Sequence, residues 1–361
     1  MNLKEQNILF LTRGMGQGGT ENIIIQLCEI FQPLVNNIIV CSCGGILVDK
    51  LRMMGINHYT IPDIANKNPV NIIKCCLTIM SIIKNEKITV VHSHHRMAAC
   101  YAELVASKNI IKLANAHNTF HDKKKLTQFA YCNTKIIAVG EMVKKNLTEY
   151  FNIPNSQISV IYNGVKAFDH HTNPIDVLQS ERVNGKILIG NIGRLSEQKG
   201  MSYFLEAAAI TVKVHPEAYF VIVGDGELKE KLKEKAKDLK LDNKVLFLGY
   251  RNDIQNVIQQ LDFVVLSSLW EGLPLTPIEA FSVGKPVIGT AVDGTKEIIH
   301  DGENGYLIPP CDAIQLAKKI NYLIENPEDR KTMGNLAIKY YLNVFSFDNF
   351  RQKYIKFYKE L

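Results

Sequence analysis

Residues 186–200 read K-I-L-I-G-N-I-G-R-L-S-E-Q-K-G. The apolar run at 187–192 has the length and composition of a buried strand, and Gly193 and Gly200 enclose a polar turn before the next helical segment. Arg194 and Lys199 lie around this turn. Open α/β sheets bind ligands at the carboxyl ends of their strands, so two cations here indicate a diphosphate clamp. Two solvated surface cations are the alternative.

The same strand, turn and helix pattern recurs on both sides of this stretch. It predicts two parallel sheets covered by helices, that is, a doubly wound α/β protein. Since 361 residues are too many for one compact core, two domains are expected. The predicted strands lie near residues 7–12, 37–43, 88–92, 110–116, 135–139, 158–162, 186–194, 220–226, 245–250, 263–268 and 286–292.

Domain boundaries follow from a change of composition. Residues 166–185 are polar and have no sustained apolar period, which is typical of an inter-domain connection. We therefore predict an N-terminal domain at 1–167, a linker at 168–185, a C-terminal domain at 186–340 and a C-terminal helix at 341–361. Aromatic residues recur along this last helix, mostly on one face, so we expect it to pack into a core, back toward the N-terminal domain.

Composition excludes several function classes. No apolar run approaches the roughly 18 residues of a membrane span, and Met1–Gln6 is polar, so we expect a cytoplasmic protein. The net charge of +6 gives a modest attraction to phosphates or anionic lipid, and peripheral contact with the inner face of the membrane stays open. Nucleic acid binding is not expected, because no basic stripe with interleaved aromatic residues occurs. The eight cysteines form no C-x-x-C pair and are expected to be mostly buried free thiols.

A glycine-rich segment, R-G-M-G-Q-G-G-T-E at 13–21, follows the first predicted strand. Gly14, Gly16 and Gly19 match the dinucleotide fingerprint, but the second strand, I-I-V-C-S-C-G-G at 38–45, lacks the acidic residue that would hold an NAD ribose. The glycines would still let the backbone come close to a phosphate or a sugar hydroxyl, which would bind at the start of a helix near Thr20. A tight turn that needs glycine is the alternative.

The strongest motif is W-E-G-L-P-L-T-P-I-E-A-F at 270–281. Thr276 is a candidate N-cap, Pro277 suits the first helical position, and Glu279 would close a capping box. This structural role explains Glu279 but not Glu271. The N-terminus of the predicted helix has free backbone N–H groups, which favour binding of an anion.

With these motifs in place, the chain resembles, over essentially its full length, the retaining glycosyltransferases of family 4. The resemblance rests on the motifs above together with H-S-H-H at 92–95, A-H-N-T at 116–119, I-Y-N-G-V at 161–165, V-G-D-G-E-L at 223–228 and F-L-G-Y-R-N-D at 247–253. It implies the GT-B fold, with two facing Rossmann-like domains. One departure is the loop at Val292, Asp293 and Gly294, where the family commonly has two adjacent glycines.

The resemblance implies roles for the charged motif residues. Arg194 and Lys199 would stabilise the charge that develops on the leaving diphosphate. Glu271 would hold donor-sugar hydroxyls, Glu279 the ribose hydroxyls, and His117 would face the donor sugar near the reacting carbon.

The remaining motif residues would complete the donor site. Backbone N–H groups around Leu275 and Thr276 would meet the phosphates. The expected donor-binding set further comprises Gly16, Gly18, Gly19, Asn163, Gly193, Asp225, Gly249, Tyr250 and Arg251, of which the last three would lie beside the base.

The resemblance also implies a reaction and its partners. The donor would be a nucleotide-sugar, UDP before GDP, and the acceptor a glycan or lipid-linked glycan of bacterial surface polysaccharide synthesis. Substitution would occur on the face from which the diphosphate departs, assisted by a donor phosphate oxygen. A double displacement with Glu271 as nucleophile is the alternative mechanism.

The same residues are compatible with two other functions and bear on possible ligands. A nucleotide-sugar epimerase of the same fold and a catalytically silent partner subunit are the rival functions. No D-x-D occurs, so neither an essential metal nor a cofactor is expected, and the histidines at 92–95 lack the partners of a zinc site. The run Lys123, Lys124 and Lys125 is a candidate contact for a lipid diphosphate or an anionic membrane; solvated lysines are the alternative.

Overall fold

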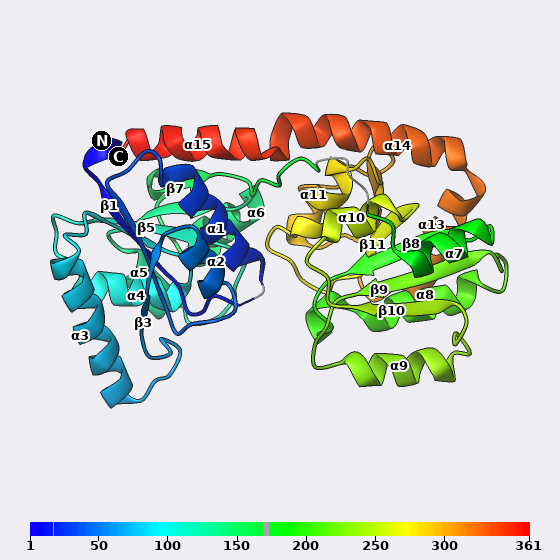
Figure 1. Ribbon diagram of the computed structural model, residues 1–361, viewed down its shortest axis with the longest axis horizontal. Coiled ribbons are helices and arrows are strands. Elements are labelled where there is room, and N and C mark those ends of the chain that lie inside the picture. Colours follow the sequence, from blue (N-terminus) through cyan, green and yellow to red (C-terminus); the bar gives the residue numbers. More distant parts are fainter. Residues whose placement is uncertain (17, 169–172) are drawn as a thin grey trace. The chain divides into compact units, whose positions relative to one another are not determined.

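The computed structural model describes residues 1–16, 18–168 and 173–361. They form two compact units (Figure 1): unit 1 is Met1–Asn163 with Phe350–Leu361, and unit 2 is Gly164–Asn349. Each unit contains one parallel sheet, which confirms the predicted α/β class.

The seven-stranded sheet of unit 1 has the order β3-β2-β1-β4-β5-β6-β7. The inner strand β1 is buried along its whole length, and Leu9 pairs with Ile39 on one side and Val91 on the other. Parallel strands covered on both faces need such continuous apolar sequences. The strands are β1 (Asn7–Leu11), β2 (Asn37–Ser42), β3 (Asn57–Thr60), β4 (Val90–Ser93), β5 (Ile111–Ala116), β6 (Lys135–Ala138) and β7 (Ile158–Val160).

The helices of unit 1 connect these strands and bury apolar side chains on them. In the longest, α3, the buried side chains are those of Cys75, Ile79 and Ile82. The helical segments are η1 (Leu3–Glu5), α1 (Gly19–Phe31), α2 (Val48–Met53), α3 (Pro69–Asn85), α4 (Arg96–Val105), α5 (Lys124–Tyr131), α6 (Glu141–Lys145), η2 (Asn146–Tyr150), η3 (Asn155–Gln157) and most of α15 (Phe347–Lys359).

Helix α15 is fixed in unit 1 by a buried polar network. The Tyr358 hydroxyl lies 2.7 Å from Nδ1 of His92, whose Nε2 lies 2.7 Å from Oδ1 of Asn115. The Asn115 amide then donates to the Tyr354 hydroxyl at 2.6 Å. Because an amide oxygen only accepts, Nε2 of His92 donates to Asn115. Burial lowers the pKa of His92 to about 4, so Nδ1 carries no proton and accepts from the Tyr358 hydroxyl.

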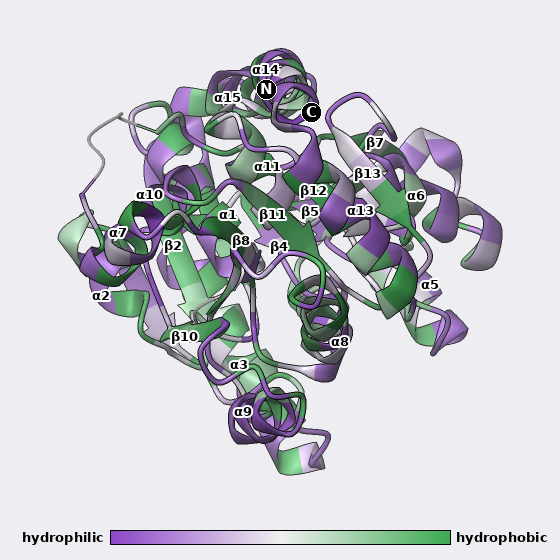
Figure 2. Cartoon of the chain, turned by 90° about the vertical axis from the view of Figure 1, so that its right-hand side faces the viewer, coloured by the Kyte–Doolittle hydropathy of each residue, from purple (hydrophilic) through white to green (hydrophobic). Residues whose placement is uncertain are grey.

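Unit 2 has a six-stranded parallel sheet in the order β10-β9-β8-β11-β12-β13. Strands such as β11 are mostly hydrophobic in Figure 2, whereas helix α9 is mostly hydrophilic. Helix α9 buries only Leu232 and Ala236, as expected for an amphipathic surface helix. The strands are β8 (Ile187–Ile192), β9 (Ala218–Val223), β10 (Val245–Gly249), β11 (Phe263–Leu266), β12 (Val287–Thr290) and β13 (Gly305–Ile308).

The helices of unit 2 enclose a core centred on Phe204, Phe220 and Phe263. They are α7 (Asp176–Val183), η4 (Glu197–Lys199), α8 (Met201–Thr211), α9 (Lys229–Asp238), α10 (Ile254–Gln259), α11 (Leu275–Ser282), α12 (Asp293–Lys296), α13 (Ala313–Glu325), α14 (Pro327–Tyr340) and η5 (Tyr341–Phe345).

Several local expectations differ from the structure. The segment predicted as a linker, 168–185, contains α7, which buries Leu178, and the backbone N–H of Ile175 bonds the Gln260 side chain in unit 2; residues 169–172 of that segment lie outside the described residues. Strands β3 and β13 were not predicted. Of the cysteines, Cys43, Cys132 and Cys311 are exposed rather than buried, and all eight are free.

The described residues contain neither a membrane-spanning helix nor a cluster of metal-binding side chains. None of the helices in this part of the chain has the length and apolar composition needed to cross a membrane. Among the same residues, no group of three or more His, Cys, Asp or Glu side chains is arranged to hold a metal ion.

Candidate functional site

The order in which strands are added to the sheet of unit 2 reverses between β8 and β11, and the candidate site lies at the carboxyl ends of these two strands. Along the chain, β8, β9 and β10 extend the sheet one way, and β11, β12 and β13 extend it the other way. Loops leave this point in opposite directions, which opens a crevice for ligands in doubly wound sheets. Arg194 and Lys199 follow β8, and Glu271 follows β11.

Backbone hydrogen bonds join the loops that follow β8, β9 and β10. The N–H of Leu195 donates to the carbonyl of Asp225 at 3.0 Å, and the N–H of Gly224 donates to the carbonyl of Gly249 at 2.8 Å. Gly224 has φ +139°, and a Cβ there would lie 1.9 Å from the Gly193 carbonyl oxygen, so only glycine fits. The structure therefore brings the predicted residues Gly193, Asp225 and Gly249 together.

A buried ion pair lies at the centre of this site. Nζ of Lys199 is 2.5 Å from Oε1 of Glu271, and the same carboxylate oxygen accepts a hydrogen bond of 2.6 Å from the Ser268 hydroxyl. Glu271 is buried and Lys199 is nearly so. Charge-assisted bonds in a water-poor setting hold both side chains in place.

The backbone around Lys199 is equally constrained. Gly200 adopts a left-handed conformation, with φ +56°, and a Cβ there would lie 2.2 Å from the Ser267 carbonyl oxygen. The Ser267 hydroxyl donates to the Lys199 carbonyl at 2.9 Å, and the N–H of Leu269 donates to the Gln198 carbonyl at 2.7 Å. These contacts join the loop after β8 to the loop after β11.

Glu279 lies on helix α11, and its half-buried carboxylate receives no hydrogen bond from the described residues. Burial raises its pKa from 4.5 to about 7, and the positive charge of Lys199 opposes part of this shift. A carboxyl that titrates near neutral pH beside a cation is typical of a functional site.

The start of α11 corrects one expectation. Thr276 is not the N-cap, because the helix already begins at Leu275 after Pro274, and no side chain caps it. The Thr276 hydroxyl instead donates to the carbonyl of Ile192, at the end of β8, over 3.4 Å. The first-turn N–H groups of Leu275 and Thr276 therefore lack a capping side chain, so the predicted capping box with Glu279 does not form.

The other charged residues of the predicted set lie at the surface. Arg194 has a 75% exposed side chain and only a long ion pair of 3.6 Å with Glu227; it forms no ion pair with the described residues around Lys199. Arg251 is held by Asp253 in a two-pronged pair, and the neighbouring Tyr250 is half exposed.

In unit 1, the glycine-rich loop follows β1, one of the two strands between which the strand order reverses, and the N–H of Met15 donates to the Gly44 carbonyl in the loop after β2. Gly18 precedes α1, Gly19 is the first residue of that helix, and no side chain caps it. Gly14, Gly16 and Gly18 all have ordinary negative φ, and a Cβ on Gly16 would meet no atom within 4 Å. The tight-turn explanation therefore fails for these glycines; Gln17, within the motif, lies outside the described residues.

His117, at the end of β5, belongs to a cluster of histidines. Its Nε2 lies 3.3 Å from Nδ1 of His94, and the two rings stack with centroids 5.5 Å apart. Burial lowers the pKa of His117 to about 3 and that of His92 to about 4, and it lowers the pKa of His94 well below its ordinary value. All three are therefore neutral at physiological pH.

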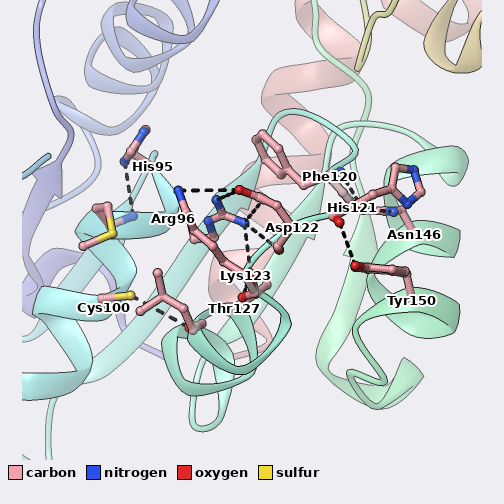
Figure 3. A network of polar contacts seen from close by, with 12 residues as sticks. His95, Arg96, Cys100, Phe120, His121, Asp122, Lys123, Thr127, Asn146 and Tyr150 are labelled. Atoms are coloured by element: carbon pink, nitrogen blue, oxygen red, sulfur yellow. Dashed lines mark hydrogen bonds and ion pairs between the residues drawn. The ribbon is translucent and has the colours of Figure 1, made fainter.

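The loop after His117 is held by polar contacts (Figure 3). Arg96 pairs with Asp122 at 2.9 Å and its guanidinium lies 4.8 Å from the centre of the Phe120 ring. The Asn146 amide bonds the backbone N–H and carbonyl of Phe120, and the Tyr150 hydroxyl donates to the His121 carbonyl at 2.7 Å. These contacts fix the chain that follows His117.

Some residues of interest lie outside the predicted set or apart from the clusters. Ser268 is not in the predicted set, although Ser267 and Ser268 at the end of the predicted strand 263–268 are a polar signal at a strand end. His94, one of the histidines at 92–95, is not in the predicted set either. Asn163 is buried, and its Oδ1 has no hydrogen-bond partner among the described residues.

Two α/β units, with a buried lysine–glutamate pair at the switch point of the second, define the class of GT-B glycosyltransferases. Two family models agree: "Glycosyltransferase Family 4" matches residues 17–167, and "Glycosyl transferases group 1" matches residues 175–340. An uncharacterized glycosyltransferase from Methanocaldococcus jannaschii is 30% identical over 294 residues, 78% of each chain. The chain belongs to glycosyltransferase family 4, and it is a glycosyltransferase.

A relative with a described activity and two solved structures extend the comparison. The UDP-Gal:alpha-D-GlcNAc-diphosphoundecaprenol alpha-1,3-galactosyltransferase of Escherichia coli is 29% identical over 336 residues, covering 86% of this chain and 85% of that protein. A glycosyltransferase from Rickettsia africae superposes with a TM-score of 0.85 at 26% identity, covering 99% and 98% of the two chains. The HepE protein of Anabaena, solved with UDP, gives 0.86 at 21% identity, covering 99% and 100%, and shows the shared fold.

Proposed function

We propose that this glycosyltransferase transfers a sugar from a UDP-sugar to a lipid-linked glycan, with retention of configuration and without a metal ion. The observation that carries the proposal is the Lys199–Glu271 pair beside Glu279, at the switch point of unit 2. A buried cation, two carboxylates and an uncapped helix start match a ligand that carries both phosphates and hydroxyls.

The cations in this proposal bind the diphosphate. Lys199 is already ordered by Glu271, so it loses little freedom when a phosphate oxygen arrives. Arg194 has only a long surface pair, so its side chain can turn toward the ligand at small cost. Both would stabilise the negative charge that grows on the diphosphate as the sugar leaves. The positive charges of Lys199 and Arg194 would take the role that a divalent metal ion has in other transferases. We therefore infer that transfer needs no metal ion.

The carboxylates bind hydroxyl groups in this proposal. Glu271 faces donor-sugar hydroxyls, and Glu279 the ribose. Oε1 of Glu271 already accepts hydrogen bonds from Lys199 and from the Ser268 hydroxyl, and these bonds make the carboxylate a weaker nucleophile. This favours same-face substitution over a double displacement through Glu271. The acceptor is assigned to unit 1, and His117 and the glycine-rich loop of that unit keep the donor-side roles that the resemblance implies.

The choice of UDP and of a lipid-linked acceptor rests on the E. coli relative. Its name gives UDP-Gal as donor and a GlcNAc-diphosphoundecaprenol as acceptor, and its similarity covers most of both chains. We extend only the classes of donor and acceptor to the present chain, and leave the sugar to the experiment.

A transfer assay tests the proposal. The protein is incubated in EDTA with UDP-glucose, UDP-galactose or their N-acetylated forms and a synthetic lipid diphosphate carrying GlcNAc. Mass spectrometry should find one added sugar with one donor, and NMR should find an α-linkage from these α-linked donors. A β-linked product would overturn retention, and activity only after addition of Mg²⁺ or Mn²⁺ would overturn metal independence. If no donor in a wider panel of UDP- and GDP-sugars supports transfer, the UDP-sugar assignment fails.

A further inference from the structure

Helix α3 of unit 1 has apolar side chains on two opposite faces. Its inner face places Cys75, Ile79 and Ile82 in the core with Tyr101 of α4. Its outer face carries a second set of large apolar side chains, which the core does not use. In Figure 1 the helix lies on the outer side of unit 1, at the lower left.

The outer set forms a continuous stripe. Val70, Ile73, Leu77 and Met80 follow one another at spacings of three and four residues, which places them along one side of a helix. Each of the four side chains is between 49% and 62% exposed. A single exposed leucine needs no explanation, but an ordered row of four indicates a surface that binds something.

Exposed lysines surround this stripe. Lys74 and Lys84 lie on the helix and are exposed, with exposed Lys67 before it and Lys87 after it. Helix α3 contains no acidic residue. Two acidic residues lie close to its ends and both have partners: Glu86 accepts from the Tyr59 hydroxyl and the Asn37 amide, and Asp63, whose carbonyl accepts from Asn71 of α3, is paired with Arg13.

We propose that the outer face of α3, defined as Val70, Ile73, Leu77 and Met80 with Lys67, Lys74, Lys84 and Lys87, lies in the headgroup layer of an anionic membrane. Apolar side chains enter such a layer to a shallow depth, while lysines beside them meet lipid phosphates. A helix of a second protein would pair an apolar stripe with charges of both signs, whereas this face has lysines alone.

This surface fits a membrane better than the lysine run identified from the sequence. Lys123 pairs with Asp122 at 3.5 Å, and Nζ of Lys124 lies 5.6 Å from the centre of the Tyr150 ring. The inference does not depend on the donor site. A lipid-linked acceptor, if the proposed function holds, would be reached from such a surface.

Vesicle sedimentation tests the inference with the full chain. The wild type should sediment with phosphatidylcholine vesicles that contain phosphatidylglycerol, and at least tenfold more weakly with phosphatidylcholine alone. Ile73→Asp/Leu77→Asp should weaken binding to the mixed vesicles at least tenfold, and so should Lys74→Glu/Lys84→Glu. The matched control is Met53→Asp on α2 of the same unit, where the side chain is 82% exposed and binding should be unchanged.

Three results would overturn the inference. One is that the wild type fails to bind the mixed vesicles. Another is that binding survives both α3 variants, or is lost instead in Lys123→Glu/Lys124→Glu/Lys125→Glu. The third is that the protein is a dimer in sedimentation velocity and becomes a monomer in Ile73→Asp/Leu77→Asp, so that a second copy covers the stripe. Thermal unfolding and UDP titration on the same samples separate loss of fold or failure of the donor site from loss of membrane binding.

Discussion

Nζ of Lys199 lies 2.5 Å from Oε1 of Glu271, although the two residues are 72 positions apart in the chain. The pair joins the loop after β8 to the loop after β11. It also orders the one buried cation of the described site, so its removal should affect both stability and ligand binding.

Lys199→Met should lower the free energy of unfolding by about 1–3 kcal/mol, because it leaves the buried Glu271 carboxylate with the Ser268 hydroxyl alone. Denaturant unfolding measures this change. The double variant Lys199→Met/Glu271→Gln should recover part of the loss, since it removes the uncompensated charge. Lys233→Met, which replaces an exposed lysine on α9, is the control and should leave stability within about 0.5 kcal/mol. Wild-type stability in Lys199→Met would show that the ion pair is not formed.

Glu279 should make unit 2 less stable at alkaline pH. Its pKa is raised from 4.5 to about 7 in the folded protein, so the folded state favours the protonated form. The stability this provides is complete below pH 4.5 and is lost as the pH rises through 7. Glu279→Gln should therefore be more stable than wild type at pH 8, on the order of 2 kcal/mol, and equal to it near pH 4.5. Equal melting temperatures at pH 8 would contradict the raised pKa.

Donor binding should also depend on the protonation of Glu279, but it should favour the carboxylate, whereas folding favours the protonated form. If Glu279 accepts ribose hydroxyls as a carboxylate, the affinity for a UDP-sugar should fall as the pH drops below 7, by up to tenfold per pH unit. Calorimetry between pH 8 and 5.5 measures this slope. Glu279→Gln should bind more weakly at pH 8 and show a flatter profile; a steep profile in that variant would assign the titration to another group.

The neutral histidines of unit 1 should make the folded protein less stable at acid pH. His92, His94 and His117 all have a pKa lowered by burial, so they contribute stability that is present above pH 6.5 and is lost as the pH falls toward 4. His94→Leu cannot take up a proton, so its stability should fall less steeply between pH 6.5 and 5, by up to about 1.4 kcal/mol per pH unit. Urea unfolding at several pH values gives the slopes, and parallel slopes would rule His94 out.

The sequence predicts most of the architecture because buried parallel strands need apolar runs. Edge strand β3, N-H-Y-T, has no such run; it pairs with β2, where Nε2 of His58 lies 2.8 Å from the Ser42 hydroxyl. Strand β13 begins at Gly305, where a Cβ would lie 2.0 Å from the Val287 carbonyl oxygen, and its apolar run, 306–308, is only three residues long. Helix α7 contributes one buried leucine, too little for a periodic signal.

The candidate site was predictable in its residues and not in its contacts. Strand-end motifs identify Lys199 and Glu271 singly, but their pairing depends on which loops the sheet order brings together. Ser268 belongs to no motif, and His94 lies in the H-S-H-H motif without an assigned role; only the structure shows that Ser268 contacts Glu271 and that the His94 ring stacks on His117. The assignment of Thr276 as N-cap failed because the helix starts two residues earlier than predicted, at Leu275 after Pro274.

Titration of the full chain with UDP in EDTA tests most directly whether the Lys199–Glu271–Glu279 cluster is a donor site. The wild type should bind with micromolar affinity, Lys199→Met should bind at least tenfold more weakly, and Lys233→Met should bind like the wild type. Unchanged affinity in a folded Lys199→Met variant, or no UDP binding by the wild type, would contradict the account.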